Sequence, residues 1–139
     1  MIFETKLVYL IEALVIIASN PSRGAIRGTE ICKILNLPER YLESEFQNLV
    51  HSGILKSIRG PKGGYVLAKE KRNISLLDLN KSIAREKSVS NFSVVANSVI
   101  LPKLSEFEGQ LAKVTLHDII QDGVSKNLLK PAPSDDFTI

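Results

Sequence analysis

Cysteine is scarce in this chain: Cys32 is the one thiol among 139 residues. A single thiol cannot form a disulfide within the chain, and it cannot supply a metal or iron–sulfur site that needs several thiolates. The two histidines, His51 and His117, lie far apart in the sequence and lack a cluster of cysteines or carboxylates at ligand spacing. The sequence therefore predicts no metal site and no cofactor, and its low cysteine content fits a reducing compartment, the cytoplasm.

Motifs of catalysis and of membrane insertion are also missing. The chain has no nucleophile motif, phosphate-binding loop or pair of catalytic carboxylates, so we predict that it is not an enzyme. The most apolar run, residues 7–18, is interrupted by Glu12 and is too short to cross a bilayer. We interpret it as a packed helix of a soluble domain rather than as an export signal.

The net charge of the chain is small: 18 basic residues are nearly balanced by 15 acidic ones, which leaves +3. The small excess is concentrated in one segment. Residues 54–72 hold six basic side chains and one acidic side chain, a net charge of +5, so the remainder is slightly negative. Such a basic strip is typical of a surface that docks on a polyanion. The alternative is a solvated loop that carries lysines without a partner.

Residues 54–68 form the most informative motif. Two short β-type runs are joined by a turn with basic and glycine residues, which predicts a β-hairpin. Lys56, Arg59 and Lys62 would place positive charge at or near its tip. Three glycines would allow positive φ angles and a close approach to a phosphate or a groove floor: Gly60, Gly63 and Gly64. A basic hairpin directly after a helical pattern indicates a DNA-binding wing.

Apolar spacing predicts three helices before the hairpin, at residues 3–19, 29–35 and 38–51. The first is apolar nearly all round and should be well buried. In the second, we expect Ile31, Ile34 and Leu35 to face inward. Pro38 is suited to a first helical position and would open the third helix.

The predicted third helix has two distinct faces. Its inner stripe contains Leu42, Phe46, Leu49 and Val50, and its polar face contains Glu39, Arg40, Glu43, Ser44 and Gln47. Two helices joined by a short turn, followed by a strand pair, have the order of a winged helix-turn-helix. The predicted fold class is mainly α with a small β-hairpin wing, together with a long C-terminal dimerisation helix.

Capping patterns and periodicity predict the rest of the chain. Ser75 and Asp78 have the spacing of a capping box that opens a helix over residues 74–84, and Thr115 and Asp118 repeat it before a short final helix. That final helix is predicted to end at Gly123. Between them, apolar residues alternate four and three apart, the spacing of a coiled-coil seam: Ile100, Leu104, Phe107, Leu111 and Val114.

The predicted organisation has four parts. A DNA-binding domain spans residues 1–84, a polar connecting loop 85–97, the dimerisation helix and short final helix 98–122, and a tail that is disordered at its end 123–139. Pro102 should mark a start or a kink of the dimerisation helix. The seam is expected to mediate symmetric dimerisation, and the alternative is that it packs on the winged helix of its own chain.

With these residues in view, the chain resembles the Rrf2 family of bacterial transcription regulators from near its start to about residue 122. The resemblance is carried by residues 37–42, by Leu49, by residues 53–55, by Ser57, by Arg-Gly-x-x-Gly-Gly-Tyr at residues 59–65, and by residues 67–68 and 74–76. It implies a winged-helix homodimer that binds a palindromic operator. Many members sense iron–sulfur clusters, nitric oxide, redox state or cysteine supply.

The resemblance also indicates a branch of the family. Members that bind a cluster carry three cysteines in the segment that corresponds to residues 85–104, and this chain has none there. It therefore resembles the cluster-free branch, whose members respond through a reactive cysteine, a small ligand or a protein partner. Cys32 stands where the family usually has alanine, so a buried thiol is expected, and a redox sensor is the alternative.

Candidate DNA contacts come from the third helix and the wing. The helix contributes Arg40, Tyr41, Glu43, Ser44 and Gln47, and the wing contributes Lys56, Ser57, Arg59, Gly60 and Lys62. Arg59 is suited to the minor groove, and Lys56 and Lys62 to phosphates. The helix side chains can read base edges or simply face solvent. Tyr65 is expected to pack its ring under the wing.

Three glutamates are unexpected on a helix that is predicted to contact DNA, because phosphates repel carboxylates: Glu39, Glu43 and Glu45. Family precedent favours base reading for Glu43, the alternative being oblique docking of the helix. Glu39 would favour the helix N-terminus through the helix dipole.

The sequence supports three hypotheses. The first is a cytoplasmic, homodimeric, sequence-specific transcriptional repressor that binds double-stranded DNA. The second is a module that docks a partner enzyme through its winged helix and binds DNA weakly or only together with that partner. The third is a thiol-based redox regulator that uses Cys32.

Overall fold

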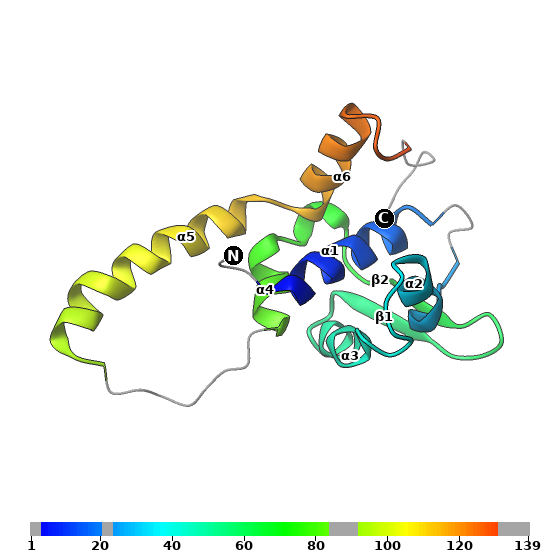
Figure 1. Ribbon diagram of the computed structural model, residues 1–139, viewed down its shortest axis with the longest axis horizontal. Coiled ribbons are helices and arrows are strands. Elements are labelled where there is room, and N and C mark those ends of the chain that lie inside the picture. Colours follow the sequence, from blue (N-terminus) through cyan, green and yellow to red (C-terminus); the bar gives the residue numbers. More distant parts are fainter. Residues whose placement is uncertain (1–3, 21–23, 84–91, 131–139) are drawn as a thin grey trace.

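The computed structural model describes residues 4–20, 24–83 and 92–130, and Figure 1 shows how its elements are arranged. The N-terminal half of the chain forms α1 (Thr5–Ala18), α2 (Gly28–Ile34), α3 (Glu43–His51) and the wing strands β1 (Leu55–Ile58) and β2 (Gly64–Leu67). It is followed by η1 (Lys71–Asn73), α4 (Leu76–Ile83), η2 (Ala96–Ile100), α5 (Leu101–Lys113) and α6 (Leu116–Ser125). This order confirms the predicted winged helix-turn-helix.

One apolar core joins the helices around α1. Five α1 side chains are buried, namely Leu7, Leu10, Ala13, Leu14 and Ile17, as its apolar sequence predicts. The same core includes Ile31 of α2, Phe46 and Leu49 of α3, Leu79 of α4 and Leu116 of α6. None of the helices in the described part of the chain has the length and apolarity needed to cross a membrane.

The wing is an antiparallel hairpin with a short third partner. Its strands pair Leu55 with Leu67 and Ile58 with Gly64. On the other edge of β2, Tyr65 exchanges two backbone hydrogen bonds with Ile26, at 2.8 and 3.2 Å. The segment before α2 therefore extends the sheet and attaches the wing to the helices.

The glycines of the hairpin have different roles. Gly60 and Gly64 adopt the expected positive φ angles, +110° and +142°. A Cβ on Gly64 would also meet the backbone of Ile26. Gly63 does not adopt a positive φ; a side chain there would meet the carbonyl oxygen of Ile58 instead. The prediction of positive φ is wrong for Gly63, where close approach of two backbone segments requires glycine.

Two predictions about α2 and α3 are wrong. Ile34 is 54% exposed rather than inward-facing, because a seven-residue helix has a narrow buried face that Ile31 and Cys32 already occupy. The third helix begins at Glu43 rather than at Pro38. Residues 38–42 form turns instead, in which the amide of Tyr41 bonds to the carbonyl of Pro38 at 3.0 Å. Such bonds to the third residue back close tighter rings than those of an α-helix.

Both predicted capping boxes are present. Ser75 and Asp78 exchange hydrogen bonds of 3.0 and 3.1 Å, and Thr115 and Asp118 exchange bonds of 3.0 and 3.2 Å. The two turns lie side by side, since Ser75 and Thr115 form an isolated antiparallel bridge. The starts of α4 and α6 are therefore joined.

The C-terminal helix continues past its predicted end. α6 runs through Gly123 to Ser125, so the predicted boundary of the tail at residue 123 is wrong. Gly123 serves packing instead, because a Cβ there would collide with the side chain of Leu129. The rest of the predicted tail, residues 131–139, lies outside the described residues.

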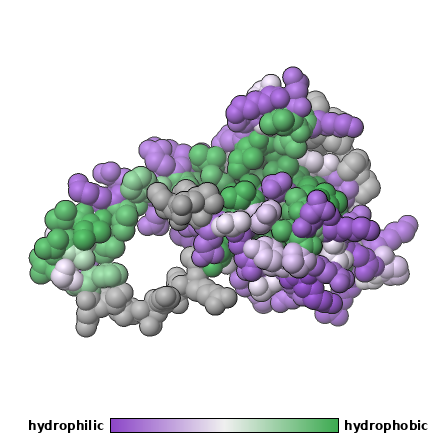
Figure 2. All heavy atoms as spheres, viewed as in Figure 1, coloured by the Kyte–Doolittle hydropathy of each residue, from purple (hydrophilic) through white to green (hydrophobic). Residues whose placement is uncertain are grey.

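The helix formed by η2 and α5 projects from the winged helix as an arm (Figure 1). Helical structure begins at Val94, within the predicted loop 85–97, most of which lies outside the described residues. Pro102 falls in the first turn of α5, where a π-helical turn gives way to α-helix. Of the seam residues, Ile100, Leu104, Phe107 and Val114 are 49, 51, 64 and 37% exposed, and Leu111 is half-buried. Figure 2 shows apolar atoms gathered on this arm. In the described part of the chain, these four side chains remain partly exposed beside the winged helix.

Two glycine substitutions should separate strained from permissive positions. Gly64→Ala should lower the free energy of unfolding by about 1–3 kcal/mol, because L residues rarely adopt its φ and the new Cβ would meet Ile26. Gly109→Ala is the control, since its surroundings on α5 are open and alanine is favoured in helices by roughly 0.5–1 kcal/mol. Urea unfolding followed by circular dichroism measures both, and equal effects would contradict this assignment.

Candidate nucleic-acid interface

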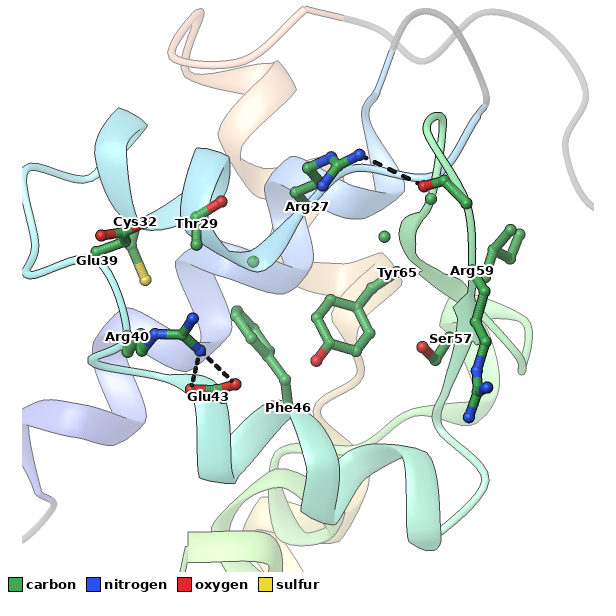
Figure 3. Close-up of a pocket in the computed structure, with 15 residues that line it drawn as sticks. Arg27, Thr29, Cys32, Glu39, Arg40, Glu43, Phe46, Ser57, Arg59 and Tyr65 are labelled. Carbon is green, nitrogen blue, oxygen red and sulfur yellow. Dashed lines mark hydrogen bonds and ion pairs between the residues drawn. The ribbon is translucent and has the colours of Figure 1, made fainter.

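A crevice of about 360 Å³ separates the wing from α2 and α3. Five of the sequence-predicted DNA contacts line it: Arg40, Glu43, Ser57, Arg59 and Gly60. The other five do not: Tyr41, Ser44, Gln47, Lys56 and Lys62. Figure 3 shows Arg40 and Glu43 on the helical wall and Ser57 and Arg59 on the wing wall. The helical and wing candidates therefore border one opening.

Arg40 and Glu43 form an ion pair on the helical wall. Nη1 of Arg40 donates to both carboxylate oxygens of Glu43, at 2.9 Å each. The hydrogen bond with Glu43, and then its negative charge, raise the pKa of Arg40. Arg40 lies in the turn before α3, whereas Glu43 is its first helical residue, so the late start of the helix shapes this pair. The Glu43 charge is thus compensated within the protein.

The other two glutamates differ from their predicted roles. Glu45 is 9% exposed and pairs with Lys6 of α1 at 3.3 Å, so it does not belong to the polar outer face. Glu39 precedes α3, and the first helical turn holds Glu43 and Glu45 instead. The predicted role of Glu39 at the helix N-terminus is therefore wrong, because that turn begins four residues later.

Tyr41 packs towards α1. Its ring meets that of Tyr9 edge-on, with centroids 6.0 Å apart, and the Lys6 ammonium lies 4.9 Å from its centroid. The half-buried Tyr41 therefore helps to attach the turn before α3 to the core, and its role as a DNA contact stays a prediction. Ser44 and Gln47 are exposed on α3.

The wing presents its polar side chains to solvent. Lys56, Ser57, Arg59 and Lys62 are all exposed. Its tip is closed by a hydrogen bond of 2.9 Å from the amide of Gly63 to the carbonyl of Gly60. Cations on a short, closed turn stand clear of the protein and can approach a duplex.

Tyr65 packs under the wing, as predicted. Its ring lies against Phe46 of α3, with centroids 5.0 Å apart. Burial, and then the charge of Glu43, raise the pKa of Tyr65, so the phenol stays protonated at neutral pH. The contact joins the wing to the centre of α3.

Sequence reasoning missed Arg27 and Gly28. Nη2 of Arg27 donates to the carbonyl of Pro61 at 2.7 Å and lies 3.4 Å from that of Gly60. A Cβ on Gly28 would come within 3.2–3.3 Å of the Phe46 and Tyr65 rings. No sequence pattern signals either contact, because the partners lie far along the chain and Arg27 stands outside the basic strip.

Cys32 is buried, as predicted. The thiol is 1% exposed and belongs to the core, although its residue also borders the crevice. Within residues 4–20, 24–83 and 92–130, no group of three or more histidine, cysteine or acidic side chains is placed to hold a metal ion.

A family model described as Rrf2, Iron-dependent Transcriptional regulator, matches residues 3–122. The chain is similar to IscR of T. potens, with 29% identity, a TM-score of 0.74 and 94% of each chain covered. It is also similar to CymR of B. subtilis, titled the global cysteine regulator, with 25% identity, a TM-score of 0.68, and 88% of this chain and 98% of that chain covered.

Several curated relatives are matched over about half their length. The alignment with the transcriptional regulator IscR of Escherichia coli has 32% identity and covers 49% of this chain and 42% of the relative. Transcriptional regulators are not enzymes, which agrees with the prediction from the missing catalytic motifs. The similarity to these regulators does not favour the alternative of a module that docks a partner enzyme. The match over residues 3–122, together with the wing and helix-turn-helix described above, shows that this chain belongs to the Rrf2 family of transcriptional regulators.

Proposed function

We propose that this protein is a cytoplasmic, homodimeric repressor that binds a palindromic DNA operator and carries no iron–sulfur cluster. The observation that carries this proposal is the crevice bordered by both the recognition helix α3 and the basic wing. An α-helix fits the major groove of B-DNA, and an arginine on a narrow projection fits the minor groove. With both elements at one opening, α3 and Arg59 can enter neighbouring grooves of one duplex.

Dimerisation is supported by the arm. Exposed apolar side chains at helical spacing are favourable when a second copy covers them, because burial removes their surface from water. A two-fold dimer presents two wings and two recognition helices, which suits half-sites roughly 34 Å apart along the duplex. This symmetry is what a palindromic operator requires.

The absence of a cluster is supported by the cysteine count. An iron–sulfur cluster is held by several thiolates, whereas this chain has Cys32 alone, and that thiol is buried in the core. The iron named in the description of the family model is thus not carried over to this chain. The signal to which this protein responds would instead be a small ligand, a protein partner or oxidation of Cys32.

Selection of fragments from the native genome by the purified protein tests DNA binding. We expect a small set of fragments that share a two-fold symmetric sequence. The logarithm of the binding constant should fall with the logarithm of salt concentration by about 0.9 for each phosphate contact. Binding of all fragments alike, or a nearly flat salt dependence, would contradict the proposal.

Loss of the wing-tip guanidinium should reduce operator affinity. Arg59→Ala should weaken binding by roughly tenfold or more, and the preference for A·T pairs beneath the wing should decrease, because Arg59 would occupy the narrow minor groove. Fluorescence anisotropy with the selected operator and with variants of those pairs measures both effects. Lys103→Ala, which removes a cation from α5, is the control and should bind as the unsubstituted protein does.

Removing the charge of Arg40 or that of Glu43 from the ion pair on the helical wall should change DNA binding in opposite ways. Arg40→Ala should weaken binding to any duplex, because Glu43 would then face phosphates without compensation. Glu43→Gln should keep or strengthen binding to unrelated DNA while reducing discrimination among operator variants by about 1–3 kcal/mol at one base pair. The same anisotropy series measures both, and unchanged discrimination in Glu43→Gln would favour oblique docking of the helix.

A charge in the seam should separate the two copies. Phe107→Glu places a carboxylate at a 64% exposed apolar position, so the dimer should dissociate and operator affinity should fall by at least tenfold. Light scattering after gel filtration gives the mass, and Gln110→Glu is the matched control on the same helix. A monomeric unsubstituted protein would overturn the dimer proposal.

A further inference from the structure

We propose that Arg27 is a positioning residue: it anchors the wing tip and thereby places Arg59 for its groove. This inference rests on the function proposed above. Arg27 lies immediately before α2, with an extended backbone (φ −71°, ψ 143°). Its Nη2 atom donates to the carbonyl of Pro61 at 2.7 Å. It also lies 3.4 Å from the carbonyl of Gly60, the contact that Figure 3 marks with a dashed line. Both carbonyls belong to the turn that directly follows Arg59.

The tip needs an anchor that the rest of the wing does not provide. The base of the wing is held by the Ile26–Tyr65 bridge and by the packing of Tyr65 on Phe46. Residues 59–62 beyond it are exposed. In the described part of the chain, the side-chain hydrogen bonds that reach this turn from the helical part come from Arg27. Without them, the turn could swing about the hairpin base.

A guanidinium suits this task. The two N–H groups on Nη2 lie in the guanidinium plane and can each be directed at one of two neighbouring carbonyls, whereas a lysine ammonium is a compact charge on a flexible stem without that planar geometry. Hydrogen bonds from a charged donor are also stronger than those between neutral groups. Arg27 therefore holds the wing wall of the crevice at a set distance from the helical wall, which is the distance between the two elements that would read DNA.

A double-mutant cycle with Arg59 tests whether Arg27 acts through it. The probe is the duplex that the unsubstituted protein selects from its genome. Arg27→Ala should weaken binding roughly tenfold alone but less than about twofold in an Arg59→Ala background, because residues that act as a unit are not additive. Equal losses in both backgrounds would overturn the proposal.

Two further variants separate positioning from a direct phosphate contact. Arg27→Lys keeps the charge but loses the planar pair of donors on Nη2, so it should bind nearly as weakly as Arg27→Ala, with an unchanged salt dependence. Lys33→Ala removes an exposed cation from α2 and is the control for charge loss, and its effect should add to that of Arg59→Ala. Full binding by Arg27→Lys, or a salt slope lower by about 0.9 in Arg27→Ala, would assign Arg27 to a phosphate and overturn the proposal.

Hydrogen exchange of the free protein tests the anchor without DNA. The amide of Gly63, which closes the tip, should exchange at least about threefold faster in Arg27→Ala and not in Arg59→Ala, because the released turn opens more often. Unchanged exchange in Arg27→Ala would overturn the anchor. If the unsubstituted protein selects no DNA, the proposed function fails, while this exchange measurement still decides whether Arg27 holds the tip. Circular dichroism confirms that each variant is folded.

Discussion

The packing of the Tyr65 ring against Phe46 is the contact on which the rest of the site depends. A two-stranded hairpin is marginal in water by itself, so the wing takes its stability and its direction from the helices that it touches. Tyr65 brings β2 to the centre of α3, and its backbone pairs with Ile26 just before α2. Gly28 leaves room for both rings, since a Cβ there would crowd them. These contacts make the wing and the helix-turn-helix one body, and the crevice between them follows.

Local compensation of charge explains how a near-neutral chain can carry a surface for a polyanion. Two carboxylates of α3 are paired, Glu43 with Arg40 and Glu45 with Lys6. The first pair lies at the crevice, where it reduces repulsion of phosphates, and the second lies against α1, where it joins the recognition helix to the core. The cations of the wing remain exposed. The electrostatic field at the protein surface therefore depends on which charges are paired, and less on the net charge of the chain.

Features that depend on neighbouring residues could be predicted from the sequence. Both capping boxes, the hairpin and the buried face of α1 follow from spacings of a few residues. Features that depend on distant segments could not: the exposure of Ile34 follows from what else packs on α2. The hydrogen bond from Arg27 to Pro61 joins residues 34 positions apart, so no periodic pattern in the sequence predicts it. About half of the sequence-predicted contacts lie at the crevice, whereas the residue that holds its far wall was not foreseen.

Chemical probing of an operator complex is the most direct test of the claim that α3 and the wing grip one duplex together. Dimethyl sulfate methylates guanine N7 in the major groove and adenine N3 in the minor groove, so one experiment reports on both grooves. We predict protection of guanines and of adjacent adenines in the same half-site, repeated about one helical turn away. Protection confined to one groove, or to opposite faces of the duplex, would contradict the account.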